Sequence, residues 1–273
     1  MLSIIVPTYN SGKTIKDLLR SIEAQTCKDD YEVIFIDNLS SDNTKKIIYN
    51  SKINDFSFFS KKDEGIYDAI NYGVKKAKND WVWILGSDDV IYEKTTITKI
   101  FKFLSKISQN ISAIYGTVLF KSNNLIYNNK FSIKEHFNKS LCQQSIIYKK
   151  NAIYKIGFFE NKYITTADYV LNIKLLKEDP NSFAYINLPL AIYNDRGASF
   201  FKTDKNYLKE SLYLRINNLG CYMNISDLLA SFLGRRGFIY YLLNNKINDS
   251  LNLIKIFLRI IFNKFAVSKK KYK

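Results

Sequence analysis

Two adjacent carboxylates follow an apolar run in the first third of the chain. The stretch WVWILGSDDV, residues 81–90, passes from residues suited to a buried strand directly into Asp88 and Asp89. Neighbouring carboxylates repel each other, and burial makes their charged forms less favourable. A divalent cation removes this repulsion, and Mg²⁺ or Mn²⁺ takes oxygen ligands, often completed by substrate phosphates. The pair therefore predicts a metal site that binds a phosphorylated ligand.

Other apolar runs also end in polar or acidic residues. The first run ends at Pro7, Thr8 and Tyr9, the second ends at Asp37, and Asp63 follows the third. A single aspartate at such a position is more often a helix cap or a turn residue. Caps at every strand end would still leave the adjacent carboxylate pair unexplained. We therefore interpret these residues together as one ligand-binding edge.

These residues need a sheet that places their strands side by side. Each apolar run precedes a helical pattern, at residues 11–25, 40–50, 65–78 and 92–106. Four strand and helix pairs in succession predict an α/β fold with a parallel sheet and helices on its faces. In such sheets ligands bind beyond the carboxyl ends of the strands.

Four segments, in this order along the chain, carry a family resemblance. They are SIIVPTYNSGKTIKDLLRSIEAQT, EVIFIDNLSSDNT, KKDEGIYDAINYGVKKAKNDWVWILGSDD and TTADYVLNIKL, within residues 1–195. Together they resemble the motifs of family 2 glycosyltransferases, and most closely the bacterial subgroup that builds capsule, exopolysaccharide or lipopolysaccharide. The resemblance implies the GT-A (Rossmann-like) fold, with a mainly parallel sheet flanked by helices. It also implies inverting, metal-dependent transfer of a sugar from a nucleoside-diphosphate sugar, UDP-linked, to a glycan or lipid-linked acceptor.

The resemblance gives roles to the residues at the strand ends. Pro7, Thr8, Tyr9 and Asp37 match positions that hold the nucleotide base and ribose. Asp63 resembles an aspartate that also faces the base, and a carboxylate suits uracil because it accepts the N3–H of that ring. A turn residue is the alternative interpretation of Asp63.

The carboxylate pair matches the D-x-D region of the family. In that region Asp88 would bind ribose, and Asp88 and Asp89 would hold Mn²⁺ or Mg²⁺ under the diphosphate. Gly86 stands where the common D-x-D-D form has an acidic or amide side chain. Two carboxylates remain, and we expect Asp89 to be the direct ligand.

The second half of the chain supplies the acceptor side. Gln143 and Gln144 match a His-Gln pair of the family, so the titratable member is missing here. Asp168 opens a helical pattern, where a carboxylate that favours the helix dipole is the ordinary interpretation. By resemblance, Asp168 is instead the catalytic base that accepts a proton from the acceptor hydroxyl. Arg196 either pairs locally or lies on a loop that closes over the bound diphosphate.

The C-terminal quarter is strongly basic. Residues 202–273 hold fourteen Lys and Arg against four Asp and Glu. We expect a GT-A domain at 1–200, divided into a nucleotide-sugar half (1–95) and an acceptor half (96–200), and a basic amphipathic helical extension at 201–273.

The last segment of this extension, residues 246–273, has an apolar stripe and a polar face. The expected stripe is Ile247, Leu251, Ile254, Leu258, Ile261 and Phe265. Such a helix is suited to peripheral contact with an anionic membrane. Packing on its own domain, or on a second copy in a homodimer, is the alternative.

Composition limits the location and the partners. The chain has 273 residues, 41 Lys and Arg, 25 Asp and Glu and a net charge of +16, which favours a polyanionic partner. Its three scattered cysteines predict a reducing compartment. Neither a signal sequence nor an apolar run of about eighteen residues is found, so we expect a cytoplasmic protein, or one at the inner face of the cytoplasmic membrane. Scattered aromatic residues argue against nucleic acid, and His136 is expected to be solvated or loosely packed.

Two other functions are consistent with some of these features. A nucleotidyltransferase would be expected to have a glycine-rich phosphate loop after the first strand, but PTYNSGKT has Pro7 where the loop motif needs its first glycine. A non-catalytic glycan- or lipid-binding scaffold would lack nucleotide-dependent turnover.

Overall fold

The computed structural model describes residues 1–27, 30–127, 130–197, 202–234 and 237–270, with side chains up to residue 264. In chain order the elements are β1 (Leu2–Thr8), α1 (Ile15–Glu23), β2 (Tyr31–Asp37), α2 (Thr44–Tyr49), β3 (Phe56–Ser60), α3 (Ile66–Lys76), β4 (Trp81–Ile84), β5 (Val90–Ile91), α4 (Thr96–Leu104), β6 (Ala113–Phe120), β7 (Ile126–Tyr127), α5 (Ile133–Asn138), η1 (Gln143–Ser145), β8 (Ile146–Lys149), α6 (Lys150–Ile156), α7 (Ala167–Glu178), β9 (Phe183–Tyr193), α8 (Lys205–Leu219), η2 (Gly220–Tyr222), α9 (Ile225–Leu233), α10 (Phe238–Asn244) and α11 (Ile247–Lys270).

One sheet organises the chain. Its strand order is β3-β2-β1-β4-β8-β6-β9-β5, and β7 pairs with β6. The strands β1 to β4 are parallel, as the alternation of apolar runs and helical patterns predicted. β8 then runs antiparallel to both β4 and β6, and β5 antiparallel to β9. The predicted α/β fold is therefore confirmed, with antiparallel pairings concentrated in the second half.

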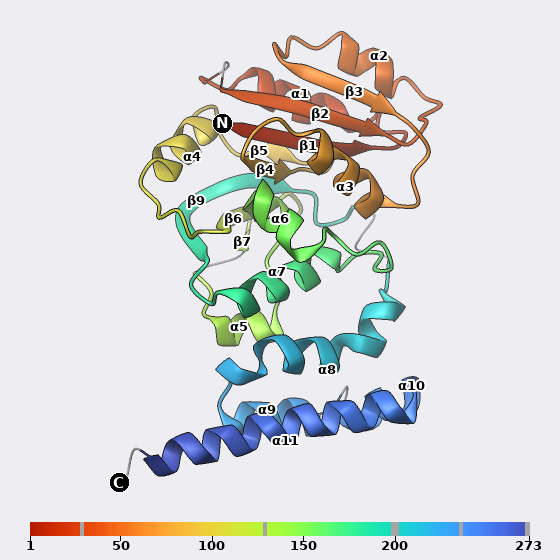
Figure 1. Ribbon diagram of the computed structural model, residues 1–273. Helices are drawn as coiled ribbons and strands as arrows, with labels where there is room; N and C mark the ends of the chain where they lie inside the picture. The colour runs from red at the N-terminus through yellow and green to blue at the C-terminus, as the bar shows by residue number, and fades with distance from the viewer. Residues whose placement is uncertain (28–29, 128–129, 198–201, 235–236, 271–273) are drawn as a thin grey trace.

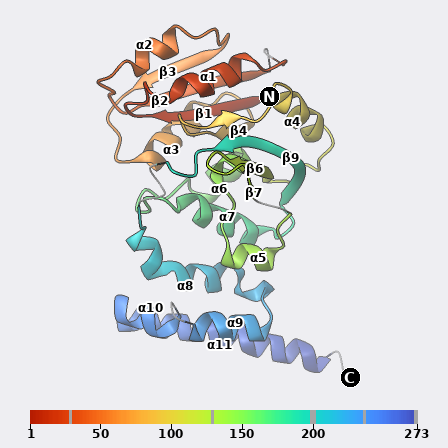
Figure 2. The ribbon, with the colours of Figure 1, turned by 180° about the vertical axis from the view of Figure 1, so that it is seen from behind.

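Helices cover both faces of the sheet (Figures 1 and 2). α1, α2 and α4 pack on one face, and α3, α7 and α8 lie on the other. Ile4 and Ile5 illustrate the alternation, because each belongs to a different one of the two apolar cores. Strands buried on both faces are nearly continuous apolar runs, which explains the sequence of β1 and β2.

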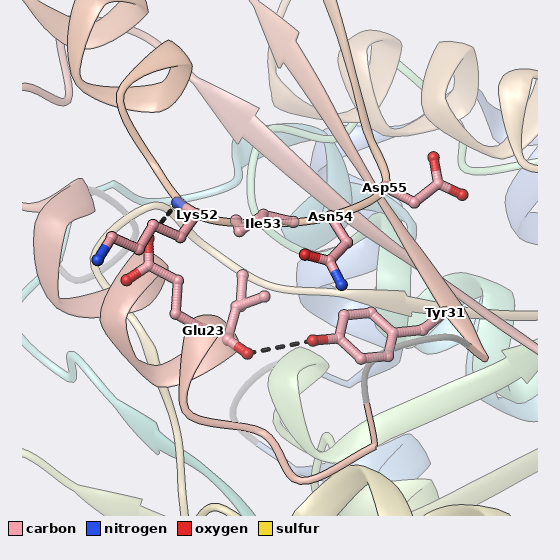
Figure 3. A pocket seen from close by; sticks show the side chains of 7 residues that line it. Glu23, Tyr31, Lys52, Ile53, Asn54 and Asp55 are labelled. Carbon is pink, nitrogen blue, oxygen red and sulfur yellow. Dashed lines mark hydrogen bonds between the residues drawn. The ribbon is translucent and has the colours of Figure 1, made fainter.

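The two edges of the parallel half differ. At the carboxyl ends, the register aligns Thr8 with Asp37 and Asp37 with Ser60, so polar side chains from three strands meet. At the opposite edge, the Tyr31 hydroxyl donates to the carbonyl of Ile22 at 3.1 Å, the bond drawn as the dashed line from Tyr31 in Figure 3. The cavity there has a volume of only about 10 Å³, room for about one water molecule. Ligand binding is therefore expected at the carboxyl edge.

The C-terminal helices form a layer beyond α8 (Figures 1 and 2). Leu253 and Phe257 of α11 are buried in the same apolar core as α7 and α8. These two residues are not in the stripe expected from the sequence, and the stripe residues Ile247, Leu251 and Leu258 are exposed. The expected stripe is therefore largely exposed, and α11 packs through a second apolar face beside it. The Phe265 side chain lies outside the described residues.

No helix in the described part of the chain is both long enough and apolar enough to cross a membrane.

Candidate active site

Asp168 lies in the first turn of α7 and lines a cleft of about 590 Å³. The side chain is buried, and its Oδ1 accepts a hydrogen bond of 3.0 Å from the Tyr67 hydroxyl. Burial raises the pKa of Asp168 to about 6, although the bond from Tyr67 acts in the opposite direction. A carboxylate with this pKa is mostly ionised near pH 7 and remains basic enough to accept a proton.

Tyr67 lies on α3, whereas Asp168 lies on α7, so the bond joins two separate helices. Its ring stacks on Phe159 with the centroids 5.8 Å apart and an interplanar angle of 13°. Burial raises the pKa of Tyr67 well above its usual value, and the charge of Asp168 adds to this effect. The hydroxyl therefore stays protonated and acts as a fixed donor to the carboxylate.

The adjacent carboxylates lie after β4 and are held by Asn194. The Asn194 side chain donates to Asp88 Oδ2 at 2.7 Å, and its backbone N–H donates to Asp89 Oδ1 at 3.2 Å. Gly86 N–H donates to Asp89 Oδ2 at 2.7 Å. Asp89 is thus buried with both oxygens occupied, whereas Asp88 is only half-buried.

Gly86 makes this arrangement possible. A Cβ atom at position 86 would lie 2.8 Å from Asp88 Oδ1 and 2.9 Å from Asp89 Oδ2, closer than real Cβ contacts. Burial, followed by the charge of Asp88, raises the pKa of Asp89 to about 7. Two carboxylates that destabilise each other's charge beside an open cleft suit a divalent cation.

The residues present can supply only part of a metal shell. Among the described residues, no group of three or more His, Cys, Asp or Glu side chains is arranged to hold a metal ion. A cation at Asp88 and Asp89 would therefore need further oxygen ligands, such as those of a diphosphate.

Asp37 connects the ends of the first three strands. Its carboxylate accepts hydrogen bonds from the hydroxyls of Thr8, Ser40 and Ser60 and from the Ser40 backbone N–H, at 2.6–3.0 Å. Asp37 is 2% exposed. These contacts fix the loop between β2 and α2 against the end of β1.

The remaining expected nucleotide-binding residues line the same edge. Tyr9 is 63% exposed and Pro7 lines the cleft. The Asp63 backbone N–H donates to the Asn38 side chain at 3.1 Å, so the loops after β2 and β3 are joined. Asp63 Oδ1 accepts from Gly65 N–H at 3.0 Å, the contact expected of a turn residue, and burial raises the Asp63 pKa. The contact at Gly65 leaves Asp63 Oδ2 available to a ligand.

Arg196 lies on the loop after β9. Its side chain is exposed, and the neighbouring Asp195 is anchored through hydrogen bonds from the Ser122 backbone and hydroxyl. The same loop approaches the carboxylate pair, because the Cβ position of Gly197 is 3.1 Å from Asp88 Oδ2. Arg196 therefore belongs to a loop that borders the site.

Residues 3–161 match the family described as Glycosyl transferase family 2. The chain is also 31% identical over 214 residues to a PGL/p-HBAD biosynthesis glycosyltransferase of Mycobacterium tuberculosis, covering 77% of this chain and 83% of the relative. This chain belongs to glycosyl transferase family 2. Membership of this family makes it a glycosyltransferase, so the nucleotidyltransferase and scaffold alternatives do not hold.

Solved structures show the same fold as this glycosyltransferase. Staphylococcus aureus TarS 1–349 in complex with UDP-GlcNAc has a TM-score of 0.66 at 19% identity, over 95% of this chain and 81% of TarS. Glucosyl-3-phosphoglycerate synthase from M. tuberculosis, in complex with Mg²⁺ and UDP, has a TM-score of 0.57 at 15% identity, over 79% of each chain. The GT-A fold expected from the motifs is thereby confirmed.

Three residues that organise the site of this glycosyltransferase were not expected from the sequence: Tyr67, Asn194 and Asp204. Asp204 Oδ2 accepts hydrogen bonds from Ile164 N, Thr165 N and the Thr166 hydroxyl at 2.7–3.0 Å. Its Oδ1 caps α8 by accepting from Tyr207 N. Asp204 therefore fixes the loop that leads into the Asp168 helix.

Gln143 and Gln144 lie where the family has its His-Gln pair, and both line the cleft. The Gln144 side chain lies near Asp89 and partly offsets the rise in the pKa of that carboxyl that burial causes. Gln143 Nε2 is buried and has no hydrogen-bond partner among the described residues, so it is a donor available to a ligand oxygen.

His136, by contrast, is far from solvated. It is 2% exposed and its ring lies 5.5 Å from that of Tyr169, so the expectation of a solvated or loosely packed histidine was wrong. His136 is buried because α5 packs its ring against Tyr169 of α7 and Phe183 of β9.

Proposed function

We propose that the enzyme transfers a sugar, with inversion, from a UDP-sugar to a hydroxyl of an acceptor in bacterial surface glycan synthesis. The observation that carries the proposal is Asp168. It is a buried, ionisable carboxylate, held by Tyr67, on the wall of a cleft that is also lined by Pro7 and Gly86. A base and the nucleotide edge of the sheet thus share one cavity.

The catalytic step follows from this position. The Asp168 carboxylate accepts the proton of the acceptor hydroxyl as the hydroxyl oxygen attacks the anomeric carbon. The bond from that carbon to the diphosphate breaks on the opposite face, and the nucleoside diphosphate departs with the electron pair. Attack opposite the leaving group inverts the anomeric configuration.

For the metal we propose Mn²⁺ or Mg²⁺ at the carboxylate pair. The half-buried Asp88 is the better candidate for the direct ligand, because both oxygens of Asp89 already accept N–H bonds. This proposal reverses the preference for Asp89 drawn from the sequence. When bound, such a cation neutralises charge that develops on the leaving diphosphate.

The donor is proposed to lie along the carboxyl edge. Pro7, Tyr9 and Asp63 would contact the base and ribose. Thr8 and Asp37, which are buried and bonded to each other, would hold this edge in place beneath them. Support comes from the chemistry of the edge and from TarS and the synthase, whose structures contain UDP-GlcNAc and UDP with Mg²⁺. The exposed Arg196 would approach the diphosphate from its loop.

The acceptor is proposed to occupy the rest of the cleft. Phe120 and Tyr127 stack with their centroids 5.1 Å apart, and Tyr193 lies against Phe120 at 5.9 Å. All three line the cleft together with Asp168. Aromatic rings offer an apolar surface to the C–H face of a sugar or to a hydrophobic part of the acceptor.

A donor screen tests the proposal. Thermal shift and hydrolysis are measured with UDP-, GDP- and dTDP-sugars, with and without Mn²⁺. We expect a UDP-sugar to raise the melting temperature only when Mn²⁺ is present. Stabilisation by a different nucleotide would replace the donor assignment, and metal-independent stabilisation would contradict the metal site.

A further inference from the structure

α11 presents two different apolar faces. Leu253 and Phe257 face inward, and the Phe257 ring stacks on Phe232 of α9 with the centroids 4.1 Å apart. Ser250 is also buried on this inward face. The inward face therefore packs α11 against the rest of the helical layer.

The second apolar face points to solvent. We call it the outer stripe and define it by Ile247, Leu251, Leu258 and Phe262, which are 71%, 49%, 57% and 74% exposed. At about 100° per residue, these four side chains project from one side of the helix. The neighbouring helices α9 and α10 also expose large apolar side chains, namely Leu233, Ile239 and Leu243. Large apolar residues exposed along one side of a helix on a water-soluble surface mark an interaction site.

Basic residues border the outer stripe. Lys255 and Arg259 are exposed, and at about 100° per residue they project from the side of the helix next to the outer stripe. Asp249 is the only acidic residue of α11, and it projects from roughly the opposite side. The stripe is therefore an apolar surface beside positive charge.

Either a second copy of the chain or a lipid bilayer could cover the outer stripe, and the charges beside the stripe distinguish the two. A second copy would bring its own Lys255 and Arg259 close to those of the first across a two-fold axis, which is unfavourable. An anionic bilayer would instead attract both residues and accept the apolar side chains between its headgroups. The observations favour the bilayer.

We infer that the outer stripe, with Lys255 and Arg259, docks the enzyme on the surface of an anionic lipid bilayer. α11 would lie in the plane of the interface and would not cross it, in keeping with the polar and charged residues along the helix. Sugar transfer is not needed for this inference, because lipid binding can be measured without donor or acceptor.

Cosedimentation of the full chain with vesicles tests the inference. The vesicles are phosphatidylcholine alone or phosphatidylcholine mixed with phosphatidylglycerol, at low and at high salt. We expect binding to the mixed vesicles only, weakened by salt because the charges are screened. Absence of binding to mixed vesicles would overturn the inference.

Two double variants separate the apolar and the charged contributions. Leu258→Ser with Phe262→Ser should weaken vesicle binding at least tenfold, because each side chain loses its apolar burial. Lys255→Gln with Arg259→Gln should weaken it about 25-fold, about fivefold for each charge removed. A matched control, Lys102→Gln on α4 with Lys106→Gln in the turn that follows, removes the same charge far from α11 and should bind within about twofold of wild type.

Sedimentation equilibrium without lipid tests whether a second copy of the chain covers the outer stripe instead. The wild-type chain is expected to be monomeric, and the Leu258→Ser, Phe262→Ser variant should have the same mass and an unchanged melting temperature. A wild-type dimer that this variant dissociates would overturn the inference in favour of a second copy. The inference would also be overturned if the Leu258→Ser, Phe262→Ser variant and the Lys255→Gln, Arg259→Gln variant both bound vesicles as well as wild type does.

Discussion

The Tyr67 hydroxyl donates a 3.0 Å hydrogen bond to Asp168 across 101 positions of sequence. Because this bond favours the ionised carboxylate, it opposes the rise in pKa that burial causes. We expect kcat/KM of the wild-type enzyme to rise with pH and level off above a midpoint near 6, where Asp168 loses its proton. Tyr67→Phe keeps the stacked ring and removes the donor, so the midpoint should move to higher pH. A pH profile with an unchanged midpoint would show that Tyr67 has only a packing role.

Asp168→Asn tests the base itself. The amide keeps the shape of the side chain and cannot accept the proton, so turnover should fall by about a hundred- to ten-thousand-fold. Affinity for the UDP-sugar and Mn²⁺, measured by calorimetry, should stay close to wild type. Turnover within about threefold of wild type would mean that Asp168 only stabilises the start of α7.

The carboxylate pair should respond differently to two similar substitutions. Asp88→Asn can still accept from Asn194 through its amide oxygen, so it should fold normally and lose Mn²⁺-dependent UDP affinity. In Asp89→Asn one backbone N–H, of Gly86 or Asn194, loses its acceptor, and stability should fall by about 1–3 kcal/mol. Calorimetry and thermal unfolding compare the two variants. Unchanged metal-dependent affinity in Asp88→Asn would rule out Asp88 as a ligand.

Asp204 should influence turnover through the loop that it holds. Asp204→Ser can still cap α8, but its shorter side chain releases the backbone of Ile164 and Thr165. Asp204→Ala loses the cap as well and should be about 1 kcal/mol less stable than Asp204→Ser. Both variants should lose turnover and keep donor affinity. Wild-type turnover in Asp204→Ser would show that the loop positions itself without Asp204.

His136 should make the fold sensitive to acid. Burial lowers its pKa to about 4, so His136 stays neutral in the folded protein and takes up a proton on unfolding between about pH 6.5 and 4. Its contribution to stability is fully present above about pH 6.5 and is lost as pH falls, by on the order of 3 kcal/mol. His136→Phe keeps the aromatic contacts and should flatten this part of the stability curve, measured by urea unfolding. An equal slope in both proteins would assign the acid sensitivity to other groups.

The expected fold and the edge that carries the site came from local patterns. The apolar runs and helical spacings predicted β1 to β4, and a parallel sheet must bring the carboxyl ends of its strands together. For that reason Thr8 and Asp37 could be expected at one edge of the sheet, and the register then pairs them. The family motifs then pointed to Asp168, which does line the cleft.

The residues that hold these groups could not be predicted in the same way. Asn194 bonds to Asp88 across 106 positions, and Tyr67 bonds to Asp168 across 101. Such contacts depend on how two halves of the sheet pack, and neither hydrophobic period nor spacing contains that information. The packed face of α11 was missed for a related reason, since only its neighbours decide which of two apolar faces is buried.

Gly86 has a consequence for any attempt to exchange this segment with that of a relative. Because both carboxylates fold back toward the place where its side chain would stand, residues 86, 88 and 89 form one interlocking unit. Restoring the more common acidic residue at this position would displace the two existing carboxylates before it could add a third. The site with Gly86 is therefore built differently from one with the D-x-D-D form. Introducing that form here would also require a change in the loop that carries Asn194, because Asn194 bonds to both carboxylates.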